Sequence, residues 1–72
     1  MARNICGQQI KRIRMARTPK VSQEDLASRL AIRGLTLSQA QIAKIENGQR
    51  PISDFELLAI ANSLRVPVQA LF

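Results

Sequence analysis

The chain has 72 residues, enough for one small domain, and 46% of them are hydrophobic, which supports a packed core rather than a disordered chain. Its formal net charge of +6 favours an anionic partner, most often nucleic acid. The lack of histidine and the single cysteine, Cys6, exclude an internal disulfide, histidine-based catalysis and a zinc site built from these side chains. We therefore expect no catalytic residue, no metal and no cofactor.

Nothing in the sequence has the form of a membrane or targeting segment. No apolar run approaches the roughly 18 residues that a membrane-spanning helix needs. Residues 1–4 lack the apolar stretch of a signal peptide. We expect one domain over residues 1–72, in the cytoplasm and without a membrane partner. Its core should be aliphatic, because Phe55 and Phe72 are the only aromatic residues.

The first predicted helix covers residues 4–17. Cys6, Ile10 and Ile13 recur there at spacings of four and three, which places them on one helical face. Pro19 disfavours helical backbone at the residue before it and so ends the segment. Cys6 is expected to be a small buried residue rather than a reactive thiol. The charges of this helix are expected to form a solvated face: Lys11, Arg12 and Arg17.

One six-residue pattern occurs three times and predicts three helix starts. It reads V-S-Q-E-D-L from Val21, L-S-Q-A-Q-I from Leu37 and I-S-D-F-E-L from Ile52. The serine can accept a hydrogen bond from the N–H three residues later, and the Asp, Gln or Glu at that position can reach back to the serine N–H. The flanking apolar residues fit a hydrophobic staple. The pattern predicts three N-caps: Ser22, Ser38 and Ser53.

Each predicted start is followed by apolar residues at helical spacing and by a stop signal. The expected buried faces are Leu26, Ala27, Leu30 and Ala31, then Ile42 and Ile45, then Leu57, Ile60, Ala61 and Leu64. Gly34 and Gly48 are the expected ends of the second and third helices. A last turn should close the bundle with Leu71 and Phe72. The fold class is therefore all-α, with four helices and a short fifth.

The third predicted helix has two different faces when residues are placed about 100° apart. Ile42, Ile45 and Glu46 fall on one side. The other side holds small or polar residues: Ala40, Lys44, Asn47 and, at the N-terminal tip, Gln39. Glutamine can pair with adenine, lysine can donate to guanine, and alanine can meet a thymine methyl, so this face suits a major groove. For one helix taken alone, a merely solvated polar face is the stronger interpretation.

The order of motifs along the chain makes a DNA-contacting face the stronger interpretation. The motifs are G-Q-Q-I-K-R-I-R from Gly7, S-Q-E-D-L-A from Ser22, I-A-K-I-E-N-G-Q-R-P from Ile42 and L-L-A-I-A-N-S-L-R-V from Leu57. In their order and spacing they resemble the lambda-repressor-like, or Xre-type, helix-turn-helix family over nearly the whole chain. The resemblance implies that the second and third helices form the helix-turn-helix unit, with residues 39–47 as the recognition helix.

The same resemblance implies roles for individual residues. Gln23, at a helix N-terminus, would hold a DNA phosphate. The base-contacting residues would be Gln39, Ala40 and Lys44. Asn47 and Arg50 would grip the DNA backbone after the recognition helix. For Gln41, a helix-capping role and a contact to the DNA backbone are about equally expected. Arg14 and Glu46 would form an ion pair between the first and third helices.

One departure from the family pattern lies in the turn. The segment I-R-G-L-T-L from Ile32 makes the connection about five residues longer than is usual in the family. We expect an extra helical turn to Arg33, with Leu35 and Leu37 holding the loop against the core. The alternative is that Thr36 caps the recognition helix with Gln39 as its capping-box partner.

The sequence is best explained by a bacterial or phage transcriptional regulator that binds specific double-stranded DNA without catalysis. A homodimer on a palindromic site is compatible with the resemblance, although little chain follows Leu64 to build an interface. The main alternative is a protein-interaction module of antitoxin or adaptor type on the same fold. A structured-RNA binder is disfavoured because aromatic stacking residues are nearly absent.

Overall fold

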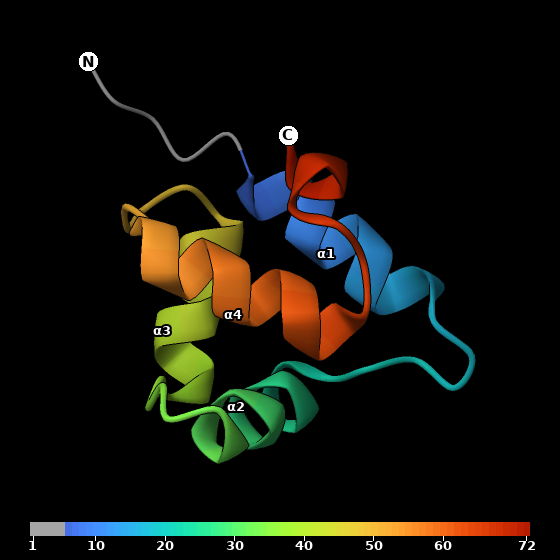
Figure 1. Ribbon diagram of the computed structural model, residues 1–72, viewed down its shortest axis with the longest axis horizontal. Coiled ribbons are helices and arrows are strands. Elements are labelled where there is room, and N and C mark those ends of the chain that lie inside the picture. The colour runs from blue at the N-terminus through green and yellow to red at the C-terminus, as the bar shows by residue number, and fades with distance from the viewer. Residues whose placement is uncertain (1–5) are drawn as a thin grey trace.

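Four α-helices and one 3₁₀ turn make up the chain in a computed structural model that describes residues 6–72 (Figure 1). They are α1 (Gly7–Ala16), α2 (Gln23–Ile32), α3 (Gln39–Glu46), α4 (Asp54–Leu64) and η1 (Val68–Leu71). The described residues contain no strand, so the all-α prediction is confirmed. Residues 4 and 5, included in the first predicted helix, lie outside the described part. None of the helices described is long and apolar enough to cross a membrane.

The three predicted capping serines are present, each with a complete capping box. Ser22 pairs with Asp25, Ser38 with Gln41 and Ser53 with Glu56. The three serine hydroxyls accept from the backbone N–H three residues later at 2.9–3.2 Å. Since these bonds join residues only three apart, they form wherever the local sequence supplies them. The alternative cap at Thr36 is wrong, because α3 begins directly after Ser38.

Three helices end in the same way, with a residue in the left-handed region. These residues are Gly34 (φ 83°), Gly48 (φ 76°) and Arg65 (φ 59°). In each case the N–H of the next residue reaches the carbonyl five residues before it, at 2.8–3.0 Å. This hydrogen bond closes the helix in a Schellman motif. The first two were predicted from glycine, which has no Cβ to obstruct the conformation; the third was not predicted.

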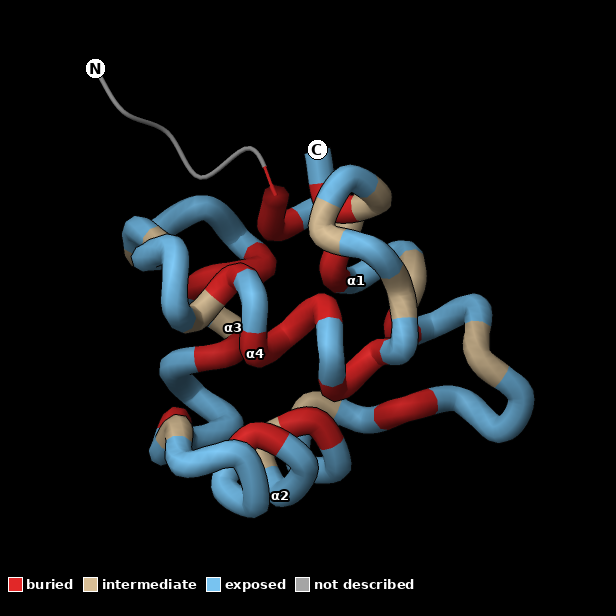
Figure 2. Tube along the Cα trace, in the orientation of Figure 1, coloured by how far each residue is buried: buried red, intermediate tan, exposed pale blue. Residues whose placement is uncertain are grey.

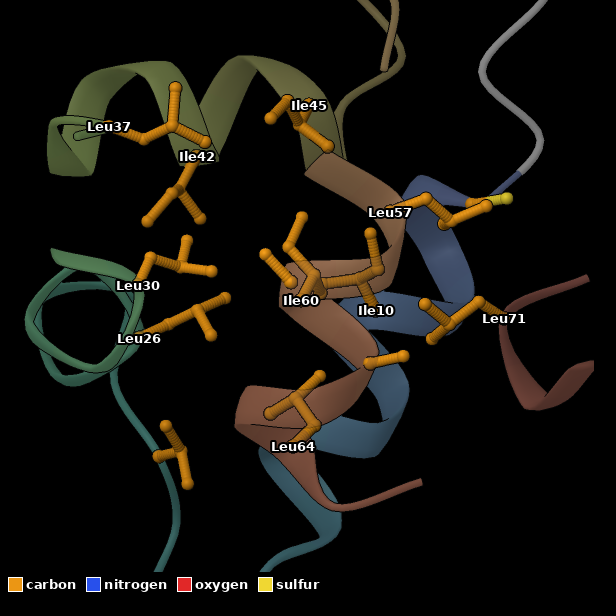
Figure 3. Packing of buried hydrophobic residues seen from close by; sticks show 14 residues of the cluster. Ile10, Leu26, Leu30, Leu37, Ile42, Ile45, Leu57, Ile60, Leu64 and Leu71 are labelled. Carbon is orange, nitrogen blue, oxygen red and sulfur yellow. The ribbon is translucent and has the colours of Figure 1, made fainter. Parts of the chain in front are cut away.

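The core lies where the four helices face one another (Figure 2). Figure 3 shows aliphatic side chains from α1, α2, α3, α4 and η1 meeting in one interior. Eight of them are almost completely buried: Ile10, Leu26, Leu30, Ile42, Ile45, Ile60, Leu64 and Leu71. Cys6 and Leu37 are buried, and Leu35 packs against the core, so the long turn is held by its leucines as predicted.

Three expectations about burial were wrong. Phe72 is 62% exposed, because Leu71 alone fills the interior at the end of the chain. Ala31 is exposed, so the apolar face of α2 is narrower than expected. Arg17 is not simply solvated, since its guanidinium donates to the carbonyl of Leu64 at the end of α4. The first helix also ends one residue earlier than predicted, at Ala16.

Gly7 lets α1 approach α3 closely. A Cβ built at Gly7 would lie 2.3 Å from the carbonyl oxygen of Ile45 and 2.9 Å from that of Glu46. The N-terminus of α1 therefore lies against the last carbonyls of α3. The partial positive charge of one helix end meets the partial negative charge of the other, which favours the contact. A side chain larger than hydrogen at Gly7 would force the two helices apart.

Candidate nucleic-acid interface

The buried and exposed sides of α3 contain the residues that helical spacing assigned to them. Ile42, Ile45 and Glu46 are buried. Gln39, Ala40 and Lys44, the three residues expected to contact bases, are exposed, and so is Gln41. Among the described residues, Lys44 makes no side-chain hydrogen bond or ion pair, and no packing role accounts for it. This helix therefore presents a lysine, an alanine and a glutamine to the outside.

A buried ion pair supports the other side of α3. Arg14 of α1 binds both carboxylate oxygens of Glu46, from Nε to Oε2 at 2.7 Å and from Nη2 to Oε1 at 2.8 Å. The two side chains are 7% and 1% exposed. The third guanidinium nitrogen of Arg14 donates to the carbonyl of Val21 at 2.9 Å. The pair implied by the family resemblance is thus present, and it also ties the segment before α2 to α1.

Two glutamines continue this network to the surface. Gln23 donates from Nε2 to Oε1 of Glu46 at 3.0 Å. Gln39 then donates from Nε2 to Oε1 of Gln23 at 2.5 Å. The side chains of the first residue of α2 and the first residue of α3 are therefore linked to each other, and through Gln23 to the buried carboxylate of Glu46. Sequence reasoning placed both glutamines in the interface but did not foresee that they bind each other.

An open depression of about 370 Å³ lies at these two helix N-termini. It is lined by Arg14, Ser22, Gln23, Glu24 and Gln39. Backbone N–H groups at the start of a helix point outward and carry partial positive charge, so they favour an anion. The network thus holds the amide side chains of Gln23 and Gln39 at this depression, which Glu24 also lines.

The sequence profile of the helix-turn-helix family matches residues 10–71, which is most of the chain. The chain belongs to the lambda-repressor-like, or Xre-type, helix-turn-helix family. Proteins of this family are DNA-binding regulators in general and are not typically enzymes. No curated protein and no solved structure matches the chain. In this helix-turn-helix domain α2 and α3 are the two helices of the motif, joined by residues 33–38.

Two further interface candidates lie at the ends of α3. The side chain of Gln41 accepts from the Ser38 N–H at 2.9 Å, so its carbonyl oxygen serves as a cap. Of the two roles expected for Gln41, the structure therefore shows the capping role. The amide N–H groups of the side chain take no part in the cap. Asn47 is exposed and is the C-terminal cap residue of α3, which ends one residue earlier than predicted, at Glu46.

Arg50 has a partner that sequence reasoning missed. Its guanidinium binds Glu56 through two hydrogen bonds, at 3.1 Å to Oε1 and 2.9 Å to Oε2. This bond is the main reason why the pKa of the Glu56 carboxyl lies below its ordinary value. Glu56 was assigned only to the Ser53 capping box. The available signal was a cation and a carboxylate on the two sides of the short turn through Pro51.

Proposed function

We propose that this helix-turn-helix domain binds specific double-stranded DNA, as part of a bacterial or phage transcriptional regulator, with α3 in the major groove. The observation that carries the proposal is the exposed side of α3. Ala40 and Lys44 lie there without a packing task, beside Gln39, on a helix whose opposite side is fixed by the core and by the Arg14–Glu46 pair. An exposed side chain that packs against nothing is available to meet base edges.

The Gln23–Gln39 pair supports two different roles at the helix N-termini, a phosphate contact and a base contact. Gln23 uses one amide hydrogen on Glu46, and its second amide hydrogen can donate to a phosphate oxygen. Gln39 keeps its carbonyl oxygen and one amide hydrogen after binding Gln23, which is the pair that a bidentate contact to adenine needs. A phosphate contact at Gln23 would thereby set the position of the base-reading Gln39.

Lys44 and Ala40 would complete the reading surface. A lysine donates to guanine O6 or N7, and the methyl group of an alanine fits against the methyl of thymine. Asn47 and Gln41, at the two ends of α3, would add contacts to the DNA backbone. The overall charge of +6 would attract the duplex and give binding a steep dependence on salt.

Arg50 is proposed as a backbone contact that competes with Glu56. A phosphate oxygen would have to share or replace the carboxylate that the guanidinium binds. Arg50→Ala should therefore flatten the slope of log K against log salt by at most about 0.9, the value for one phosphate contact. Preferred and scrambled duplexes should be affected alike, because a backbone contact does not read sequence.

The decisive experiment starts from selection of bound sites in a random duplex pool. Wild type, Lys44→Ala and the control Arg12→Ala are then titrated against the preferred and a scrambled duplex at several salt concentrations. Arg12 is an exposed cation of α1, two positions from the buried Ile10 and so on the opposite side of that helix.

Lys44→Ala is expected to lose about 1–3 kcal/mol on the preferred site and to relax selection at one base position. Arg12→Ala should change binding to both duplexes equally and only slightly. Equal binding of wild type to preferred and scrambled duplexes would contradict specific readout. A binding constant that hardly depends on salt would contradict DNA binding as such and favour a protein-interaction module.

A further inference from the structure

A second concentration of positive charge lies away from α3. Four cationic side chains line one depression of about 380 Å³: Arg17, Lys20, Arg29 and Arg65. They come from the segment that joins α1 to α2, from α2 and from the end of α4. Asp25 is the only acidic residue in that lining. No residue of α3 lines this depression, and Figure 1 shows the bend of the segment between α1 and α2 on the side of the molecule away from α3.

Two of the four cations are held in place by the fold. Arg17 donates from Nη2 to the carbonyl of Leu64, and Arg29 donates from Nη1 to the carbonyl of Ser63 at 3.1 Å. These bonds satisfy carbonyls at the end of α4 and offset its partial negative charge. A guanidinium has five N–H groups, so each of these contacts occupies only part of the donor set. The bonds to the end of α4 explain where the two arginines lie. The other N–H groups of each guanidinium are not used by these bonds.

The other two cations have no comparable structural task. Lys20 and Arg65 are exposed, and among the described residues neither makes a side-chain hydrogen bond or an ion pair. Arg65 also occupies a left-handed backbone position, φ 59°, for which α2 and α3 have glycine. A glycine there would be less strained. A residue that persists in an unfavourable backbone conformation suggests a role for its side chain.

The single carboxylate of the depression does not neutralise this charge. Asp25 accepts from the Ser22 backbone N–H at 3.1 Å as part of the capping box of α2. That hydrogen bond, helped by the nearby charge of Arg29, keeps the pKa of Asp25 below its ordinary value. The carboxylate is therefore ionised at neutral pH but engaged with the helix end. Four cations against one anion leave the depression strongly positive.

We propose that this depression is a binding site for a phosphate-bearing anion, separate from the recognition helix. Its volume falls at the lower end of the range typical of small-ligand sites. Planar guanidinium groups match phosphate oxygens in two-pronged contacts, and two of them are already positioned by their bonds to α4. The phosphate can belong to a free small molecule or to nucleic acid, and the experiment separates these two sources.

The first measurement is calorimetric titration of the full chain with inorganic pyrophosphate, at an ionic strength held constant with chloride. Arg65→Gly removes one cation and replaces it with the residue that best fits the left-handed backbone, so this variant should remain folded. Lys20→Ala removes a second cation from an exposed loop. Arg12→Ala, which has the same loss of charge outside the depression, is the matched control.

Wild type and Arg12→Ala are expected to bind pyrophosphate with similar dissociation constants. Arg65→Gly and Lys20→Ala should each bind at least fivefold more weakly while retaining the circular dichroism spectrum of wild type. The proposal is overturned if wild type shows no saturable binding, or if all three variants bind equally, since that result means only general attraction to a basic protein.

The source of the phosphate is decided with a duplex of arbitrary sequence. If DNA supplies it, Arg65→Gly and Lys20→Ala should flatten the log K against log salt slope more than Arg12→Ala does, by about 0.9 for one lost phosphate contact. The duplex should also displace pyrophosphate. If a free anion supplies it, the slopes match the control and the duplex-bound protein still binds pyrophosphate. Both results support the site, and neither depends on base-specific reading by α3.

Discussion

Two regions of the molecule contain the same chemical contact in different surroundings. Arg14 binds Glu46, and Arg50 binds Glu56, each through two hydrogen bonds of 2.7–3.1 Å. The first pair lies between α1 and α3 with side chains 7% and 1% exposed. The second lies beside the loop from α3 to α4 with side chains 29% and 13% exposed. Geometry alone does not distinguish them; access to water does.

The comparison teaches how one type of contact can serve two purposes. A buried carboxylate that loses its partner keeps an uncompensated charge away from water, so the buried pair cannot open cheaply. A pair in contact with solvent exchanges one partner for water or for another anion at little cost. Arg14 and Glu46 therefore hold α3 in position, whereas the Arg50–Glu56 pair can exchange partners, as the proposed phosphate contact would require.

The largest effect is expected from breaking the buried pair. Glu46→Ala leaves Arg14 without its carboxylate in the interior and also removes the acceptor of Gln23, so we expect a loss of about 3–5 kcal/mol in the free energy of unfolding. Urea denaturation gives this value. Glu24→Ala, at an exposed glutamate of α2, is the control and should change it little. Equal urea midpoints for Glu46→Ala and wild type would show that the pair contributes nothing.

The next effect tests the close contact beside the buried pair. In Gly7→Ala the new methyl group would collide with the Ile45 and Glu46 carbonyls, which are backbone and cannot simply turn aside. We expect a loss of about 1–3 kcal/mol, as for other overpacked sites, together with weaker DNA binding as α3 is pushed outward. Gln8→Ala, at the exposed neighbouring position, should leave both quantities nearly unchanged. Full stability of Gly7→Ala would mean that the helices are not in contact there.

A smaller effect is expected where the buried network reaches the surface. Gln23→Ala removes one hydrogen bond to Glu46 but leaves the two bonds from Arg14, so the loss of stability should be about 1 kcal/mol. Gln39→Ala removes only the outermost bond and should stay within about 0.5 kcal/mol. Denaturation of both variants beside Glu46→Ala would measure how far the stabilisation extends along the network. A loss for Gln23→Ala as large as that for Glu46→Ala would contradict this order.

The smallest effect concerns the exposed pair and depends on pH. The hydrogen bond from Arg50 lowers the pKa of Glu56 below its ordinary value of 4.5, so its stabilisation is present above that pH and is lost as the pH falls through the lowered pKa. Glu56→Gln retains a capping-box residue while removing the charge. It should be less stable than wild type by at most about 1 kcal/mol at neutral pH.

Denaturation of wild type and Glu56→Gln over a series of pH values provides the check. The difference between them should shrink as the pH falls below 4.5, because wild type then loses the charge that the variant lacks. A difference that stays constant over this range would assign the effect of Glu56 to its cap rather than to Arg50.

The helix boundaries were predictable because local interactions decide them. Ser22, Ser38 and Ser53 cap residues three positions away, and Gly34 and Gly48 close helices through their own backbone freedom. The spacing of apolar residues at three and four positions then assigned most of the buried and exposed sides of the helices. The Arg14–Glu46 pair is 32 residues apart and came only from the family resemblance. Its partners could not have been matched by spacing alone.

What the sequence by itself determined, then, is the all-α architecture, its N-caps and glycine stops, and the composition of the exposed side of α3. Tertiary structure decided which polar groups meet. The approach of α2 to α3 pairs Gln23 with Gln39, and the fold brings Arg17 and Arg29 to the end of α4. The core has room for Leu71 at the end of the chain and leaves Phe72 outside. Caps depend on neighbours along the chain, whereas these contacts depend on distances and angles between helices that only packing sets.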